Sequence, residues 1–99
     1  MDIDTLQSVY FIGAGGIGMS ALERYFLSRG MVVAGYDRTP SELTSHLIEE
    51  GAQIHFEENV ELIPQACKDP STTMVVYTPA IPATHKELLY FVERGFDIH

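Results

Sequence analysis

Positive charge is scarce in this sequence. Six Lys and Arg residues stand against fourteen Asp and Glu residues, so the formal net charge is −8. Proteins that bind nucleic acids or anionic membranes depend on clustered positive charge, so we expect neither kind of partner. The one cysteine, Cys67, cannot form an intramolecular disulfide, and four histidines with one thiol form no zinc-binding pattern. We therefore predict a protein of the reducing cytoplasm without a metal site.

A membrane-spanning segment is also missing. Residues 5–22 carry no charge, but they contain four glycines and follow Asp2 and Asp4 instead of a basic flank. Of the 99 residues, 45% are hydrophobic and 20% are charged. This composition suits one domain with its own core over residues 1–99.

Apolar runs alternate with helical patterns along the chain. The runs at residues 9–12, 31–34 and 74–77 are continuous, which is typical of parallel strands covered on both faces. This alternation predicts an α/β fold, an open parallel sheet of about five strands flanked by helices. The last strand, at residues 96–99, ends with the chain, so we expect the N-terminal piece of a longer protein.

The helical patterns lie at residues 17–29, after Thr39 and after Thr84, with a weaker one at residues 60–68. In the first helix, Glu23 is expected to face solvent. Thr39 and Thr84 each precede a glutamate by three positions, which predicts capping boxes with these threonines as N-caps. His85 should then lie solvated on a helix surface.

A glycine-rich segment, Gly13-Ala14-Gly15-Gly16-Ile17-Gly18, follows the first strand and opens the first helix. This G-x-G-x-x-G context indicates phosphate binding by backbone N–H groups at the positive end of a helix. Gly13 would permit the tight turn, and Gly15 would let the backbone approach a pyrophosphate closely. Gly18 would let the helix and the strand pack without a Cβ between them. The alternative is a glycine-rich turn that serves packing only.

Asp37 lies 19 positions after Gly18, at the end of the second strand. Dinucleotide-binding folds place at this position an acid that accepts hydrogen bonds from ribose hydroxyls. The adjacent Arg38 could pair with a phosphate on the ribose, so the choice between NAD and NADP stays open. Local features alone therefore indicate an NAD(P)-binding domain. The alternative for Asp37 is a solvated turn carboxylate.

Four separated motifs also resemble those of the Mur ligases of bacterial cell-wall synthesis. Residues 13–20, G-A-G-G-I-G-M-S, are similar to that family's G-x-G-G-x-G-M-S opening. The other three motifs are Gly35-Tyr36-Asp37, His55-Phe56-Glu57-Glu58-Asn59-Val60 and Thr78-Pro79-Ala80-Ile81, with Tyr36 and Pro79 standing where the family usually has serine. The resemblance covers essentially the whole chain.

This resemblance implies a Rossmann-like first domain that holds the UDP part of UDP-N-acetylmuramic acid. It also implies an ATP- and Mg-dependent ligase that adds L-alanine, with ATP-binding and C-terminal domains elsewhere in the same chain, and a contact between His55 and uracil. The implied UDP-binding residues are Gly13, Ala14, Gly15, Gly16, Ile17, Gly18, Asp37, Arg38, His55, Asn59, Thr78, Ala80 and Ile81.

The sequence contains no G-x-x-x-x-G-K-[ST] motif, and its only lysines are Lys68 and Lys86. ATP binding of the P-loop kind is therefore excluded for these 99 residues, and we expect them to hold no cofactor, to contain no catalytic residue and to be inactive alone. Two alternatives stay open, namely the NAD(P)-binding domain of a dehydrogenase and a nucleotide-sensing regulatory module.

Overall fold

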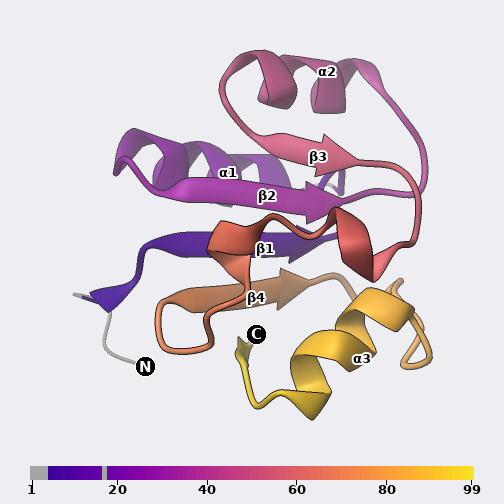
Figure 1. Cartoon of the computed structure of the whole chain (residues 1–99). Helices are drawn as coiled ribbons and strands as arrows, with labels where there is room; N and C mark the ends of the chain where they lie inside the picture. Colours follow the sequence, from indigo (N-terminus) through magenta and orange to yellow (C-terminus); the bar gives the residue numbers. More distant parts are fainter. Residues whose placement is uncertain (1–4, 17) are drawn as a thin grey trace.

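The computed structural model describes residues 5–16 and 18–99, and within them five parallel strands form one sheet of order β3-β2-β1-β4-β5 (Figure 1). The strands are β1 (Ser8–Ile12), β2 (Val32–Tyr36), β3 (Gln53–His55), β4 (Thr73–Tyr77) and β5 (Asp97–Ile98). The helices are α1 (Met19–Ser28), α2 (Glu42–Glu49) and α3 (Lys86–Glu93), with short 3-10 turns η2 (Val60–Leu62) and η3 (Gln65–Cys67). The predicted α/β sheet is confirmed. No helix of the described residues is long and apolar enough to cross a membrane.

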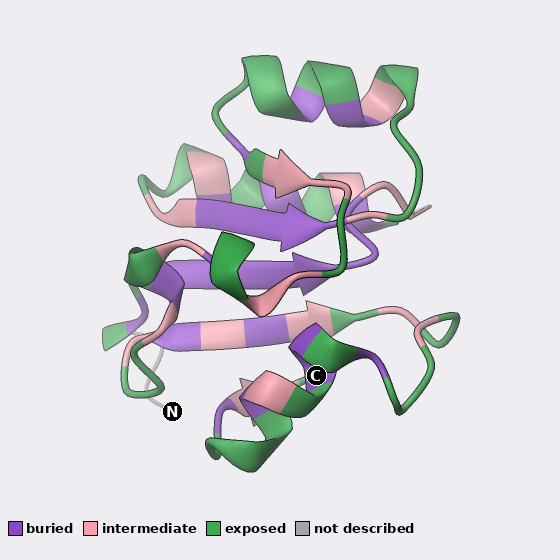
Figure 2. Ribbon diagram, turned by 45° about the vertical axis from the view of Figure 1, so that its right-hand side comes forward, coloured by how far each residue is buried: buried purple, intermediate pink, exposed green. Residues whose placement is uncertain are grey.

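The sheet has a hydrophobic core on each face. Val9 and Phe11 of the central strand β1 belong to the core under α1 and α2, whereas Tyr10 and Ile12 belong to the core under α3 and the two 3-10 turns. Figure 2 shows β1 buried along its whole length. Successive side chains of a strand point to opposite faces, so helices on both faces require the continuous apolar run that the sequence has.

Helix α1 buries an acidic side chain together with its apolar ones. Its buried residues are Met19, Glu23 and Phe26, while Tyr25 is 48% exposed. The prediction that Glu23 faces solvent is wrong. Positions 19, 23 and 26 follow the helical period, so orienting Met19 and Phe26 toward the sheet carries Glu23 inward with them.

The two predicted capping boxes are also wrong in register. The N-cap of α2 is Ser41, whose Oγ accepts from the Thr44 N–H at 3.1 Å, while Thr44 Oγ1 accepts from the Ser41 N–H at 2.8 Å. This reciprocal pair starts the helix two residues after Thr39. In α3 the N-cap is His85, whose Nδ1 accepts from the Glu87 N–H.

His85 is therefore a buried cap residue, only 4% exposed, and not the solvated surface residue that the sequence suggested. The helix predicted at residues 60–68 is replaced by η2 and η3, which Ile63 and Pro64 separate. Proline has no N–H for a helical hydrogen bond, so an α-helix cannot continue through Pro64. Cys67 is fully buried, as expected of a small packed side chain.

The register of the strands decides which loops meet. Ile12, Tyr36 and Tyr77 are paired across the sheet at the carboxyl ends of β1, β2 and β4. The loops that follow these strands therefore emerge side by side, although they are far apart in the sequence. Ligands of open parallel sheets bind at this edge.

Candidate functional site

A pocket of about 280 Å³ opens at the carboxyl edge of the sheet. Three loops contribute to it, and its lining residues are Gly13, Gly15, Gly16, Asp37, Arg38, Thr78, Ala80 and Ile81. All eight belong to the set predicted from the sequence. A larger hollow of about 710 Å³, lined by Arg29 and Thr72 among others, lies at the amino ends of the strands. That hollow is not the candidate, because it is remote from the glycine loop and from the edge at which such sheets bind ligands.

Left-handed backbone explains two of the loop glycines. Gly13 has a φ of +97° and Gly18 a φ of +88°, values that side chains with a Cβ rarely adopt. A Cβ on Gly13 would also lie 2.9 Å from Thr78 Oγ1, whereas a Cβ on Gly18 would meet nothing within 4 Å. The predicted helix–strand contact at Gly18 is therefore wrong. That position needs glycine for its backbone angle.

Gly15 is confined by the fold itself. A Cβ there would lie 2.9 Å from Thr44 Cγ2 and 3.2 Å from the carboxyl carbon of Asp37. The Gly15 N–H donates to Asp37 Oδ1 at 3.1 Å. The glycine loop is thus held against both β2 and α2. The contact with Thr44 could not be predicted from the sequence, because that residue lies in a helix 29 positions away.

The charge around the pocket suits an anion. The first turn of α1 contains no acidic residue, and the exposed Arg38 lines the pocket. Burial, and secondly the charge of Asp37, raise the pKa of Glu23 to about 8. The Glu23 carboxyl is therefore largely protonated at neutral pH and adds little repulsion. Asp37 is the one carboxylate in the lining.

Other predicted site residues lie outside this lining. Ala14 is fully buried in the core beneath α1 and α2, Gly18 immediately precedes α1, and Ile17 lies outside the described residues. His55 ends β3, and its carbonyl accepts from the Asp37 N–H at 3.1 Å, which places it one strand beyond the pocket. His55 also lines a hollow of about 350 Å³ beside β3.

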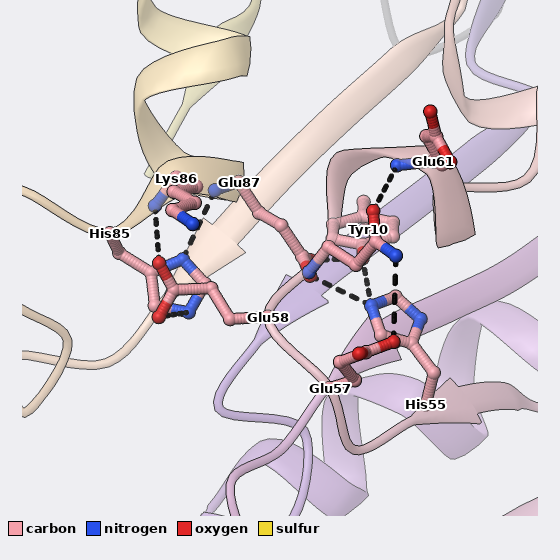
Figure 3. A network of polar contacts seen from close by, with 9 residues as sticks. Tyr10, His55, Glu57, Glu58, Glu61, His85, Lys86 and Glu87 are labelled. Atoms are coloured by element: carbon pink, nitrogen blue, oxygen red, sulfur yellow. Dashed lines mark hydrogen bonds and ion pairs between the residues drawn. The ribbon is translucent and has the colours of Figure 1, made fainter.

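His55 and Asn59 take part in a separate polar network around Glu87 (Figure 3). Nε2 of His55 lies 2.8 Å from Glu87 Oε2, which also accepts the Asn59 N–H at 3.0 Å. Tyr10 donates its hydroxyl to Glu87 Oε1 at 2.5 Å. The Asn59 side chain caps η2 by accepting from the Glu61 N–H.

Sequence reasoning missed Glu87 as a functional candidate. It was assigned only to a capping box, yet its side chain is fully buried beneath α3. The one available signal was its spacing from Phe91, which lies four positions later and places both residues on one helix face. Helical periodicity alone could not reveal the hydrogen-bonding partners of Glu87, because Tyr10 lies on β1 and His55 on β3.

Comparison with known proteins places this geometry in a family. The model described as "Mur ligase family, catalytic domain" matches residues 8–99. Over its whole length the chain is 73% identical to a UDP-N-acetylmuramate–L-alanine ligase of Phocaeicola vulgatus, of which it covers 22%. It is 60% identical over 98 residues to the protein of the same name from Parabacteroides distasonis, covering 99% of this chain and 21% of that one.

A solved structure agrees with these matches. The UDP-N-acetylmuramate-alanine ligase of Thermotoga maritima superposes with a TM-score of 0.79 at 26% identity, covering 92% of this chain and 20% of that one. The chain therefore spans about a fifth of the length of these relatives. With a family model matched over nearly all its residues and the family's glycine loop at the carboxyl edge of its sheet, the chain belongs to the Mur ligase family.

Proposed function

We propose that this chain holds the UDP part of UDP-N-acetylmuramic acid within a ligase that adds L-alanine during peptidoglycan synthesis. The observation that carries the proposal is the convergence of eight motif residues from three loops on one pocket. The names of the relatives support the substrate and the amino acid.

The pocket suggests how each part of the nucleotide is held. The diphosphate accepts hydrogen bonds from backbone N–H groups at the start of α1, where the helix dipole favours negative charge. Asp37 now accepts the Gly15 N–H, so a phosphate oxygen at that N–H displaces the carboxylate. The released Asp37 is then free to accept from ribose hydroxyls. Arg38 supplies the positive charge in the lining.

ATP and Mg belong to the remaining domains in this proposal. ATP supplies the activation of the substrate carboxylate, but these 99 residues contain neither a P-loop nor a lysine in the pocket. Within the described residues, no group of three or more His, Cys, Asp or Glu side chains could hold a metal ion. The chain thus anchors the substrate in the cytoplasm, and the ATP-binding and C-terminal domains of the same protein complete the enzyme.

Titration of the ¹⁵N-labelled chain with UDP-N-acetylmuramic acid, UDP and NADH tests this function. We expect both uridine ligands to shift the amide signals of residues 13–20 and of Asp37. A response to NADH together with silence toward UDP would instead support the dehydrogenase alternative.

Two arginine variants sharpen this titration. Arg38→Ala and Arg94→Ala change the net charge equally, but only Arg38 lines the pocket, whereas Arg94 lies over the Tyr90 ring on the α3 side. We expect Arg38→Ala to weaken UDP binding about threefold to tenfold and Arg94→Ala to leave it unchanged. Equal effects would place the nucleotide elsewhere.

A further inference from the structure

The buried network around Glu87 determines the position of one proton. The Tyr10 hydroxyl donates a hydrogen bond to Glu87 Oε1, and the Asn59 N–H donates one to Oε2. Burial, and secondly the charge of Glu87, raise the pKa of Tyr10, so this hydroxyl stays protonated. A carboxylate in contact with these donors offers only acceptors.

His55 must match this arrangement. Its Nε2 faces Glu87 Oε2 at 2.8 Å and the Tyr10 oxygen at 3.3 Å. Neither neighbour has a proton left to donate, so Nε2 carries the ring proton. In the neutral ring, Nδ1 is then a hydrogen-bond acceptor.

The Nδ1 atom is available to a ligand. In Figure 3 it points away from both Glu87 and Tyr10, and no residue of the described chain donates a hydrogen bond to it. The His55 carbonyl accepts from the N–H of Asp37, the acid that lines the glycine pocket. A nucleotide with its diphosphate at the glycine loop and its ribose at Asp37 extends its base toward β3.

We propose that Glu87 is a positioning residue, which keeps the proton of His55 on Nε2 and so presents Nδ1 as an acceptor to the nucleotide base. The ligand part of this inference rests on the proposed function. The tautomer of the His55 ring is a property of the free protein and does not depend on the proposed function.

This arrangement favours uracil over cytosine. Uracil carries an N–H at N3 that Nδ1 accepts, whereas N3 of cytosine is itself an acceptor and would face the Nδ1 lone pair. A site built for one hydrogen-bonding partner discriminates strongly, because the wrong partner leaves polar groups unpaired. Glu87 thereby contributes to base selection without touching the base.

The ring state is measured in the free 99-residue chain by two-bond ¹H–¹⁵N correlation of the His55 imidazole, at a pH where the ring is neutral. We expect the proton on Nε2 in the parent protein. Glu87→Leu removes the acceptor, so the proton should no longer be held on Nε2 alone and a share of the rings should carry it on Nδ1. A parent ring with its proton on Nδ1 overturns the proposal whether or not the variant folds, as does a folded Glu87→Leu chain whose tautomer is unchanged.

Glu58→Gln is the matched control. Glu58 accepts the Lys86 N–H at 2.9 Å at the start of the same helix and lies 3.6 Å from the His85 ring, but within the described residues it forms no hydrogen bond or ion pair with His55. We expect it to retain the parent tautomer and the parent affinities. Thermal unfolding of each variant confirms that the folded chain is being compared.

Nucleotide selection is measured by titrating UDP and CDP into the same three proteins. We expect the parent and Glu58→Gln to prefer UDP by at least about tenfold, and Glu87→Leu to lose most of that preference. A preference that survives in folded Glu87→Leu overturns the role in base selection. Failure of the parent to bind UDP contradicts the proposed function, and the ring measurement still decides what Glu87 does to His55.

Discussion

Two buried glutamates on opposite faces of the sheet have opposite surroundings. Glu23 on α1 and Glu87 on α3 both have no exposed surface. Glu87 is surrounded by the Tyr10 hydroxyl, the His55 ring and the Asn59 N–H. Both carboxyl oxygens of Glu23 lack a hydrogen-bond partner among the residues that the structure describes. Equal burial therefore says nothing about whether a carboxyl group stabilises the fold.

The donors make the difference. An ionised carboxylate that is buried without partners costs several kcal/mol, so such a group keeps its proton instead. The raised pKa of Glu23 is this response. At Glu87, three contacts join α3 to β1, to β3 and to the loop before η2. The same substitution at the two positions should therefore have opposite effects.

The largest expected effect is a loss of stability in Glu87→Leu. Removing this acceptor leaves the Tyr10 hydroxyl, the Asn59 N–H and the His55 ring without their partner inside the protein. Breaking a buried polar network of this kind costs about 3 to 5 kcal/mol. Urea unfolding measures the change, and a variant as stable as the parent would show that Glu87 is dispensable for folding.

Glu23→Leu should stabilise the chain. It replaces a buried carboxyl group that has no hydrogen-bond partner in the described part of the chain by an apolar side chain of similar size, between Met19 and Phe26 on the buried face of α1. We expect a gain of about 2 kcal/mol in the free energy of unfolding at pH 7. If this variant loses stability as Glu87→Leu does, Glu23 has a partner in solution and the contrast between the two faces is lost.

The pH dependence of stability provides the next test. The folded chain keeps the Glu23 proton up to a pH of about 8, whereas the unfolded chain releases it near the ordinary value of 4.5. Between these values the unfolded state binds fewer protons, so the free energy of unfolding falls as the pH rises, by up to about 1.4 kcal/mol per pH unit.

The measurement is the difference between the parent and Glu23→Leu, each unfolded in urea at pH 5, 6, 7 and 8. This difference isolates Glu23 from the other titrating groups, and it should grow steadily with pH. A difference that is constant from pH 5 to pH 8 would show that the pKa of Glu23 is not raised.

The smallest effect is expected at an exposed glutamate. Glu50 pairs with Arg24 at 2.7 Å, and the two side chains are 41% and 45% exposed. Solvent screens such a pair, so Glu50→Gln should unfold at the same urea concentration as the parent. A loss of stability comparable with that of Glu87→Leu would mean that the exposure of a carboxyl group to solvent does not predict how much the group contributes to stability.

The sequence predicted the elements of the fold well and their orientations poorly. Continuous apolar runs and helical periodicity identified the strands and helices, because those patterns follow from local backbone geometry. The same patterns oriented Glu23 outward, since hydropathy ranks a charged residue as exposed. Packing of Met19 and Phe26 against the sheet decided otherwise.

For the candidate site as well, the sequence located the segments and the fold decided how they meet. The glycine loop, Asp37 and the Thr78–Ile81 turn could be located from motifs, because each motif is a short continuous segment. Their meeting in one pocket follows from the pairing of β1 with β2 and β4. Gly35 was known only as part of a motif, and the structure shows that a side chain there would collide with the Phe11 carbonyl of the neighbouring strand.

By itself, the sequence determined the alternation of strands and helices, the glycine-rich loop before the first helix and the membership of a motif-defined family. These are properties of neighbouring residues, and local geometry is sufficient to produce them. Only the tertiary structure decided that Glu87 meets Tyr10, His55 and Asn59 while Glu23 meets no donor among the described residues. Those contacts join residues 28 to 77 positions apart, and the order and register of the strands, which no local pattern encodes, bring them together.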